Sequence, residues 1–303
     1  MTLFYDAQQF TFFTGYLFLI TGIIGNGINI LVFSRVRTYR TNPSTFYFLV
    51  GSIVNTLFIM INLTFRILNV GYNIDLIDKS NAWCKVRQYF LLVPAVVSTT
   101  ISCLATIDQY LATSSSVDLR RHSQIKWAHR ITVIMLIFWC AHGIPVFLFY
   151  DLSPVTKTCT NMNAAYDIYR LVYLIGIICI IPVSIMILFG CLTYRNVQQR
   201  LKCIELHIDQ QIIKMTLIHV ILVIVSLLPY GIFNIYILIT SSVVKDVDRQ
   251  VKEYLATSIL SMMAYMYYVV CNLIPMHFIH CVFHFLGELF HISGIIEALS
   301  STG

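Results

Sequence analysis

The chain has 303 residues, of which 58% are hydrophobic and only 11% are charged, and its net charge is +6. Soluble domains carry about a quarter charged residues, so the composition excludes a soluble globular protein and places most of the chain among membrane lipids. The positive charge is explained by an anionic inner leaflet facing the basic loops, and no nucleic-acid partner is expected.

Seven intervals without Asp, Glu, Lys or Arg are each about 20 residues or longer, which is the length that crosses a bilayer as a helix. They cover residues 7–34, 41–65, 88–107, 131–150, 171–194, 215–244 and 254–287. Backbone groups in lipid must be hydrogen-bonded internally, so each interval predicts a helix. We expect helices at about 9–34, 44–70, 84–112, 125–150, 169–195, 211–241 and 254–280.

The predicted fold class is therefore all-α integral membrane, a seven-transmembrane helix bundle that forms a single domain over residues 1–303. A short amphipathic helix at about 282–292 is expected to lie on the membrane surface after the seventh helix.

The basic residues of the short loops predict the orientation. Arg35, Arg37 and Arg40 follow the first helix, and no base precedes it. Short cytoplasmic loops are enriched in Lys and Arg, so the N-terminus is predicted outside the cell and the C-terminus inside. The first hydrophobic run is too long for a cleavable signal peptide, and we expect it to act as a signal anchor.

Two of the nine cysteines fall outside in this topology. Cys84 lies at the start of the third helix, and Cys159 lies in the loop after the fourth. The external side is oxidising, so this pair predicts a disulfide that holds the loop over the mouth of the bundle. The alternative is two unrelated free thiols. The other cysteines are expected to be small buried residues, with acylation as an alternative for Cys281.

Several residues at particular helix positions carry a family resemblance. Asp108 lies 24 residues after Cys84, and the remaining matching positions are Gly25, Asn26, Trp139, Pro182, Pro229 and Pro275. Over nearly its whole length the chain resembles the rhodopsin-like (family A) G-protein-coupled receptors. The resemblance implies a plasma-membrane receptor that binds an extracellular ligand and signals through a heterotrimeric G protein, without catalysis or a cofactor. The three prolines are expected to kink their helices.

The chain departs from that family at most of the polar motif positions. The DRY motif reads Asp108-Gln109-Tyr110, the sodium-site acid aligns with Asn55, CWxP reads Ser226-Leu227-Leu228-Pro229, and NPxxY reads Ile274-Pro275-Met276-His277-Phe278. These differences indicate a divergent member whose activation relay is altered. Asn26 and Asn55 are expected to make polar contacts between helices.

The lone carboxylate at the inner end of the third helix raises its own question. In the resembling receptors the Arg of DRY pairs with this acid at rest, whereas Gln109 has no charge to offer. We therefore expect Asp108 to bond nearby hydroxyls or a loop base such as Arg120 or Arg121; the alternative is a plain interfacial charge. The expected G-protein surface comprises Asp108, Gln109, Tyr110, Arg120, Arg121, Arg200 and Lys202.

Arg66 is the only base that lies well inside a predicted membrane helix, and such a charge indicates a functional site. The alternative is a side chain that extends to the outer headgroups. By helix position, the outer cavity is expected to be lined by Arg66, Leu91, Tyr230, Asn234, Tyr265 and Tyr268, although tyrosines in such helices also serve as interfacial or packing residues.

Two ligand classes are disfavoured by the resemblance. The resembling amine receptors carry an Asp where Leu91 stands, and opsins carry a Lys where Tyr268 stands. A monoamine or retinal is therefore not expected. The Arg66 side chain instead favours a peptide or small molecule with an anionic group.

A competing hypothesis is an intramembrane metal-dependent hydrolase. His280 and His284 form an HxxxH pair like that of seven-helix hydrolases resembling the ceramidases and adiponectin-type receptors, and His277 shares their helix face. A catalytic zinc needs three protein ligands, and residues 44–70, where the third His belongs, contain none. No metal site is therefore predicted. A transporter or channel is the remaining alternative, which the lack of inverted repeats disfavours.

Overall fold

The computed structural model describes residues 2–35, 42–74, 80–153, 158–161, 163–200, 207–240 and 243–270. They belong to a compact unit that extends from Met1 to Asn272. A second unit, Leu273–Gly303, lies outside the described residues. Pro275, the three histidines of the HxxxH region and the expected amphipathic helix at 282–292 therefore also lie outside them.

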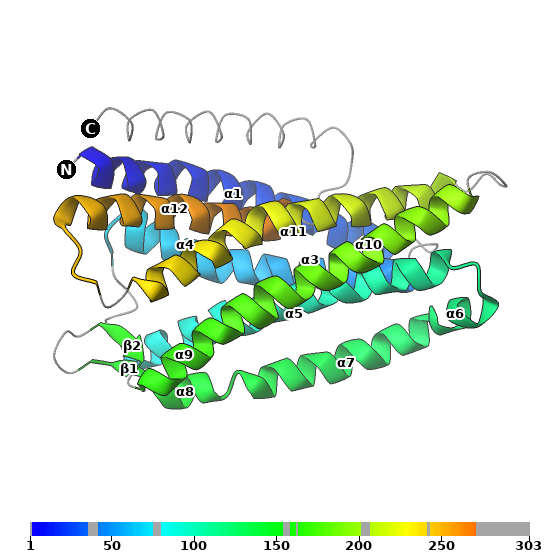
Figure 1. Cartoon of the computed structure of the whole chain (residues 1–303), viewed down its shortest axis with the longest axis horizontal. Coiled ribbons are helices and arrows are strands. Elements are labelled where there is room, and N and C mark those ends of the chain that lie inside the picture. The colour runs from blue at the N-terminus through cyan, green and yellow to red at the C-terminus, as the bar shows by residue number, and fades with distance from the viewer. Residues whose placement is uncertain are drawn as a thin grey trace. The chain divides into compact units, whose positions relative to one another are not determined.

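Helices account for nearly all of the described residues (Figure 1). The first three membrane helices are α1 (Thr2–Arg35), a composite of α3 (Pro43–Phe58), η1 (Ile59–Leu63), α4 (Thr64–Arg66) and η2 (Ile67–Gly71), and α5 (Asn81–Thr113). The η segments are π-helical. The short helix α6 (Val117–His122) follows α5. The fourth membrane helix consists of α7 (Ile125–His142) and α8 (Pro145–Phe149), and the fifth consists of α9 (Ala164–Val172), η4 (Tyr173–Ile180) and α10 (Ile181–Arg200). The last two described helices are α11 (His207–Ile239) and α12 (Val247–Val270).

Six described helical segments are long and apolar enough to cross a membrane: Leu3–Arg35, Pro43–Gly71, Asn81–Thr113, Ile125–Phe149, Ile168–Gln198 and Val220–Ile237. The first turns of α12 carry charged residues, and its uncharged stretch begins at Tyr254. In the sequence that uncharged stretch continues beyond Val270, the last described residue.

Several helix boundaries differ from those expected. α1 begins at Thr2, α9 at Ala164 and α12 at Val247, each before its expected start, and α10 ends at Arg200, beyond its expected end. The fourth helix does not continue to residue 150. It is interrupted after His142, because Pro145 has no N–H to donate to Ala141, and Tyr150 begins a strand instead.

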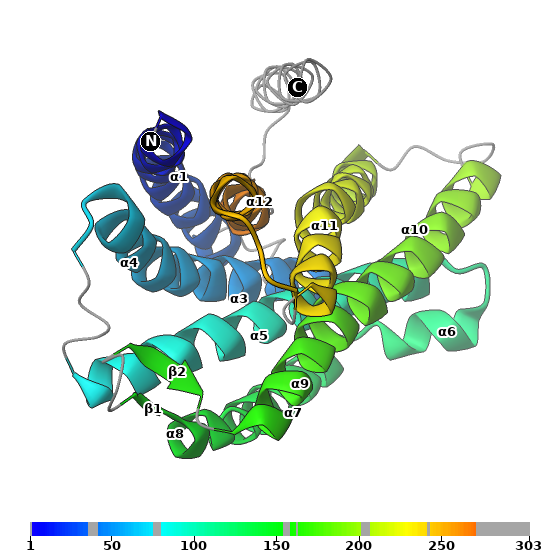
Figure 2. The same ribbon diagram turned by 60° about the vertical axis from the view of Figure 1, so that its left-hand side comes forward.

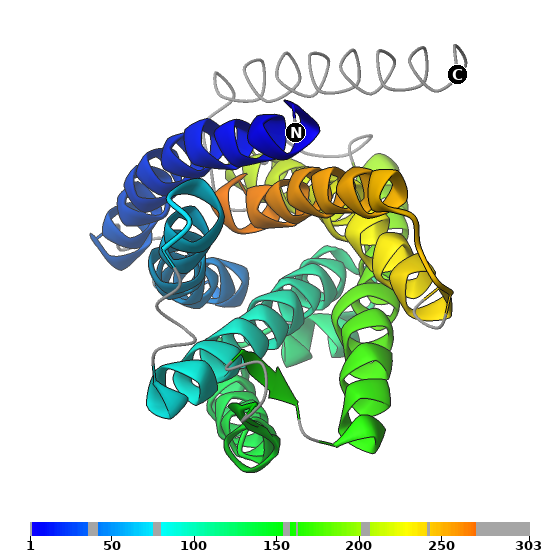
Figure 3. The same ribbon diagram turned by 90° about the vertical axis from the view of Figure 1, so that its left-hand side faces the viewer.

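α5 is the central helix of the described unit, and it packs against α3, α7, α10 and α11 (Figure 3). α1 packs on α3 and α12, and α12 also packs on α11. Ser98, Ser102 and Asp108 on α5 are almost fully buried. Side chains on α5 are therefore enclosed by the helices that pack against it.

A short antiparallel hairpin covers one end of the bundle (Figure 2). It consists of β1 (Tyr150–Leu152) and β2 (Cys159–Asn161), with Leu152 opposite Cys159. The N-terminus of α1 and the connection from α11 to α12 lie at the same end, whereas α6 lies at the other (Figure 1). We call these the hairpin end and the α6 end.

Candidate functional site

A disulfide joins Cys84, in the first turn of α5, to Cys159 in β2, as predicted. Cys84 belongs to a buried cluster with Val146 of α8, Tyr150 of β1 and Tyr166 of α9. Burial raises the pKa of Tyr166 to about 12. The disulfide and this cluster fix the hairpin to the first turn of α5.

A cavity of about 200 Å³ lies beside this cluster, and Val146, Tyr150 and Tyr166 line it as well. All six residues predicted for the ligand cavity line it: Arg66, Leu91, Tyr230, Asn234, Tyr265 and Tyr268. They come from α4, α5, α11 and α12. Most of the other lining residues are apolar, as is usual for sites that bind small molecules.

The π-helical turns determine which side chains of the second membrane helix face the cavity. Phe58 and Arg66 both line it, although eight residues separate them. In a regular α-helix these positions would point about 80° apart. The π-helical turn η1 between them accommodates one extra residue, which turns the face back by about 100°. Arg66 thereby reaches the cavity rather than the lipid.

Two further arginines line the cavity and were not among the predicted residues. Arg87 of α5 lies one turn before Leu91, and Arg170 of α9 lies one turn before Leu174. The spacing was visible in the sequence, because residues four apart share a helix face. Arg87 was overlooked because it borders the uncharged interval, where a charge is ordinarily assigned to the membrane surface.

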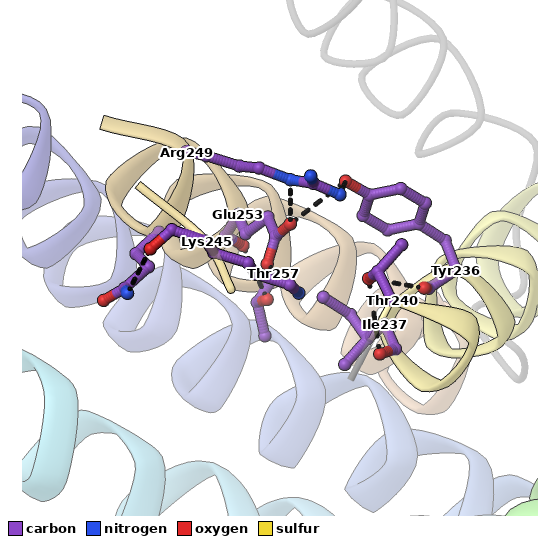
Figure 4. Close-up of polar contacts among 8 residues, drawn as sticks. Tyr236, Ile237, Thr240, Lys245, Arg249, Glu253 and Thr257 are labelled. Atoms are coloured by element: carbon purple, nitrogen blue, oxygen red, sulfur yellow. Dashed lines mark hydrogen bonds and ion pairs between the residues drawn. The ribbon is translucent and has the colours of Figure 1, made fainter. Parts of the chain in front are cut away.

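Between α11 and α12 lies a polar cluster, which we call the Glu253 cluster, formed by Tyr236, Lys245, Arg249 and Glu253 (Figure 4). The Glu253 carboxylate accepts from Lys245 Nζ at 2.6 Å, from Arg249 Nε at 3.1 Å and from the Tyr236 hydroxyl at 3.0 Å. The hydrogen bond from Lys245 is the main reason that the pKa of Glu253 is lowered. The cluster fixes the start of α12 to the end of α11, one turn beyond the cavity residue Asn234.

Tyr267 links α12 to α5 in the interior. Its hydroxyl lies 2.8 Å from Ser102 Oγ and 3.3 Å from Ser98 Oγ, and Ser98 Oγ donates to Asn55 Oδ1 at 2.5 Å. Within the described residues this cluster contains no carboxylate. Asn26 Nδ2 donates to the Tyr268 carbonyl at 3.2 Å and so joins α1 to α12.

At the α6 end, Asp108 is buried and accepts hydrogen bonds from two hydroxyls. One is the Ser44 hydroxyl at the start of α3, and the other is the Ser123 hydroxyl after α6, at 2.7 Å. In the described part of the chain no base forms an ion pair with Asp108. Of the two expected alternatives, the hydroxyls are therefore the ones that the structure brings to this carboxylate.

The other residues expected at the G-protein surface are only partly gathered. Gln109 is 4% exposed, the Tyr110 ring lies against Phe189 with centroids 5.4 Å apart, and Arg120 and Arg121 are exposed on α6. Arg200 ends α10, and its side chain, like all of Lys202, lies outside the described residues. Pro182 is the second residue of α10, directly after η4, and Pro229 lies inside α11.

The sequence profile of the family "7 transmembrane receptor (rhodopsin family)" matches residues 25–286, which is most of the chain. No curated protein matches it. The chain thus belongs to the rhodopsin family of seven-transmembrane receptors, as its cysteine, tryptophan and proline positions predicted. It is a multi-pass membrane protein with the all-α receptor fold.

Family membership also decides among the alternatives. Members of this family are receptors and not enzymes, and they couple extracellular ligands to G proteins. The hypotheses of a metal-dependent hydrolase and of a transporter or channel are therefore wrong. The family match does not select a ligand class.

Proposed function

We propose that this receptor lies in the plasma membrane with its hairpin end outside, binds an extracellular ligand in the cavity, and signals through a heterotrimeric G protein at its α6 end. The ligand is neither a monoamine nor a retinal, because Leu91 and Tyr268 supply no acid and no amine to the cavity. One observation carries the proposal: six residues expected from register alone line one cavity, beside a hairpin that a disulfide holds in place.

A route from the cavity to the interior supports coupling between the two ends. Tyr268 lines the cavity, and the next residue toward the N-terminus, Tyr267, bonds Ser102 of α5. Ser102 lies about 9 Å along the helix from Asp108 at 1.5 Å per residue. A ligand that shifts α12 would therefore change the contacts of α5 less than two turns from the buried carboxylate.

The hydrogen bonds of Asp108 support a resting contact made by hydroxyl groups instead of an ion pair. Its partners, Ser44 and Ser123, belong to the segments on either side of the inner end of α5. Hydrogen bonds to a charged group contribute about 1.5–3 kcal/mol each. These two hydrogen bonds stabilise the resting arrangement. They replace the ion pair that Gln109, which has no charge, cannot form. They break when the α6 end opens to the G protein.

The test is a cell-based panel that reports dissociation of each heterotrimeric G-protein class, with surface expression measured in parallel. We expect ligand-independent dissociation of at least one class, and reduced dissociation when Arg120 and Arg121 are both replaced by Glu. The Lys126→Glu variant is the control for a charge change elsewhere on the inner surface. If the chain reaches the cell surface and dissociates no class, the proposed coupling is wrong.

A further inference from the structure

Two arginine side chains converge on the cavity from different helices, and no described residue offers a partner for their charge. Arg66 ends α4, and Arg87 lies near the outer end of α5. The Nε atom of each is buried and has no hydrogen-bond partner in the part of the chain that the structure describes. Both guanidinium groups are close enough to Tyr265 to interact with it electrostatically. Both side chains are half-buried, and removing an unpaired charge from water is unfavourable, so this arrangement requires an explanation.

The described acidic side chains that form ion pairs at the hairpin end do not provide one. In the described residues, Asp151 is 3.9 Å from Lys85, Glu253 pairs with Lys245 and Arg249, and Asp248 pairs with Lys252. No Asp or Glu is among the described residues that line the cavity, and neither Arg66 nor Arg87 takes part in an ion pair there. The cavity therefore carries uncompensated positive charge.

The charge is confined to the outer part of the cavity. Phe58 and Ala95 line it as well, each eight residues from the arginine on its own helix and nearer the middle of the bundle. At 1.5 Å per residue the separation is about 12 Å. The apolar residues Leu92, Ile178 and Leu227 also line the cavity, and the Tyr268 ring stacks on Phe58. The cavity thus has a cationic outer portion and an apolar inner portion.

Hydroxyl and amide groups add neutral donors to the cationic portion. Tyr230, Asn234, Tyr265 and Tyr166 line the same cavity. The Asn234 amide already donates to the Tyr230 carbonyl at 2.7 Å, and the Tyr265 hydroxyl donates to the Asn62 carbonyl at 3.3 Å. The Arg66 and Arg87 guanidinium groups add charged donors to these neutral groups, and guanidinium binds carboxylate oxygens in pairs.

We propose that the ligand is a small organic acid whose carboxylate binds between Arg66 and Arg87 and whose apolar body extends inward toward Phe58 and Ala95. This inference rests on the proposed function, since it names the ligand class of the same cavity. A volume of about 200 Å³ suits a small molecule better than a peptide segment. The bound carboxylate supplies the partner that both arginines lack.

The charge preference of the cavity is measured by cysteine modification, which needs neither a known ligand nor a G protein. A Leu91→Cys variant places a thiol in the cavity, and Cys179, which also lines it, is replaced by Ser in every variant. Intact cells are treated with an anionic sulfonatoethyl or a cationic trimethylammonioethyl methanethiosulfonate. A Val244→Cys variant, at a side chain that is 98% exposed, provides the reference rates.

We expect the anionic-to-cationic rate ratio at Leu91→Cys to exceed the reference ratio by roughly tenfold, because charge in a low-dielectric cleft concentrates the opposite ion. Adding Arg66→Gln or Arg87→Gln lowers the ratio several-fold, whereas Arg66→Lys keeps the charge and most of the ratio. Only protein at the cell surface is labelled, so misfolded variants do not contribute. A ratio equal to the reference, or one that both Gln variants leave unchanged, would overturn the proposal.

A second measurement separates this inference from the proposed function. Labelling of the Leu91→Cys variant by neutral methyl methanethiosulfonate is repeated with 4-phenylbutyrate, 4-phenylbutanol or 4-phenylbutylamine, which differ only in the head group. We expect the acid to slow labelling most, and to lose this advantage in Arg66→Gln. If the alcohol or the amine protects as well as the acid, the ligand class is wrong even where G-protein coupling is intact.

Discussion

The side-chain amide of Asn62 donates to the backbone carbonyl of Phe90 at 2.8 Å and so joins the second membrane helix to the third. Phe90 lies four residues before Pro94, which is inside α5 and has no N–H to donate. The carbonyl that Pro94 leaves without its helical partner is thus satisfied by Asn62. In lipid such a replacement is needed wherever a proline interrupts a helix.

This relationship predicts a coupled effect on stability. We expect Asn62→Leu to lower the free energy of unfolding by about 1–2 kcal/mol, because the Phe90 carbonyl then has no donor. In the Pro94→Ala background the same change should have a much smaller effect, since the substituted alanine would provide the helical N–H. Thermal unfolding of the four purified variants gives the coupling energy, and equal effects of Asn62→Leu in both backgrounds would contradict this role.

A second prediction concerns the contact at the α6 end. Ser44→Ala and Ser123→Ala should each raise ligand-independent signalling, because each removes a hydrogen bond that holds the Asp108 carboxylate. Gln109→Arg should lower it by supplying a cation to the same acid. Thr113→Ala is the matched control, since the Thr113 hydroxyl bonds the Gln109 carbonyl within its own helix. Unchanged basal activity in all three variants would show that Asp108 does not control the resting state.

The Glu253 cluster predicts a pH dependence of stability. Because the pKa of Glu253 is lowered in the folded protein, chiefly by Lys245, the folded state favours the carboxylate. Its stabilising effect is present above the ordinary Glu pKa of about 4.3 and is lost as the pH falls through the lower folded value. We expect Glu253→Gln to reduce the melting temperature at pH 7, and this reduction to shrink as the pH falls below about 4.3.

The control for that prediction is a second acid on the same helix. Asp248 pairs with Lys252 at 3.0 Å, but both side chains are about two-thirds exposed, at 66% and 65%. Exposed pairs of this kind contribute only about 0.3–0.5 kcal/mol. Asp248→Asn should therefore change the melting temperature less than Glu253→Gln at pH 7, and the reverse order would argue against a structural role for the cluster.

The sequence predicted the parts of this site that follow from topology and register. Cys84 and Cys159 were the two external cysteines, and the six cavity residues followed from helix position. The hydroxyl partners of Asp108 could not be chosen in this way, because Ser44 lies 64 residues earlier in the chain. The π-helical turns were also missed, since local composition gives no signal for an extra residue in a turn. Predicting Arg87 as a cavity residue would have required knowing which face of α5 lines the cavity.

The disulfide predicts a further set of variants. Removing the bond between Cys84 and Cys159, which are 75 residues apart, should lower the stability by about 2–4 kcal/mol. Cys84→Ser, Cys159→Ser and the double variant should have the same effect, because each removes the same bond. Cys140→Ser, at an exposed free thiol, is the control. Additive losses in the double variant would show that the cysteines act separately.

The orientation of the chain underlies both the ligand cavity and the G-protein surface, and epitope accessibility tests it most directly. One tag is placed at the N-terminus and another at the C-terminus, and antibody binding is compared in intact and permeabilised cells. We predict that the N-terminal tag is detected in intact cells and the C-terminal tag only after permeabilisation, because seven crossings place the ends on opposite sides. Detection of both tags in the same compartment, or of the C-terminal tag alone in intact cells, would contradict the account.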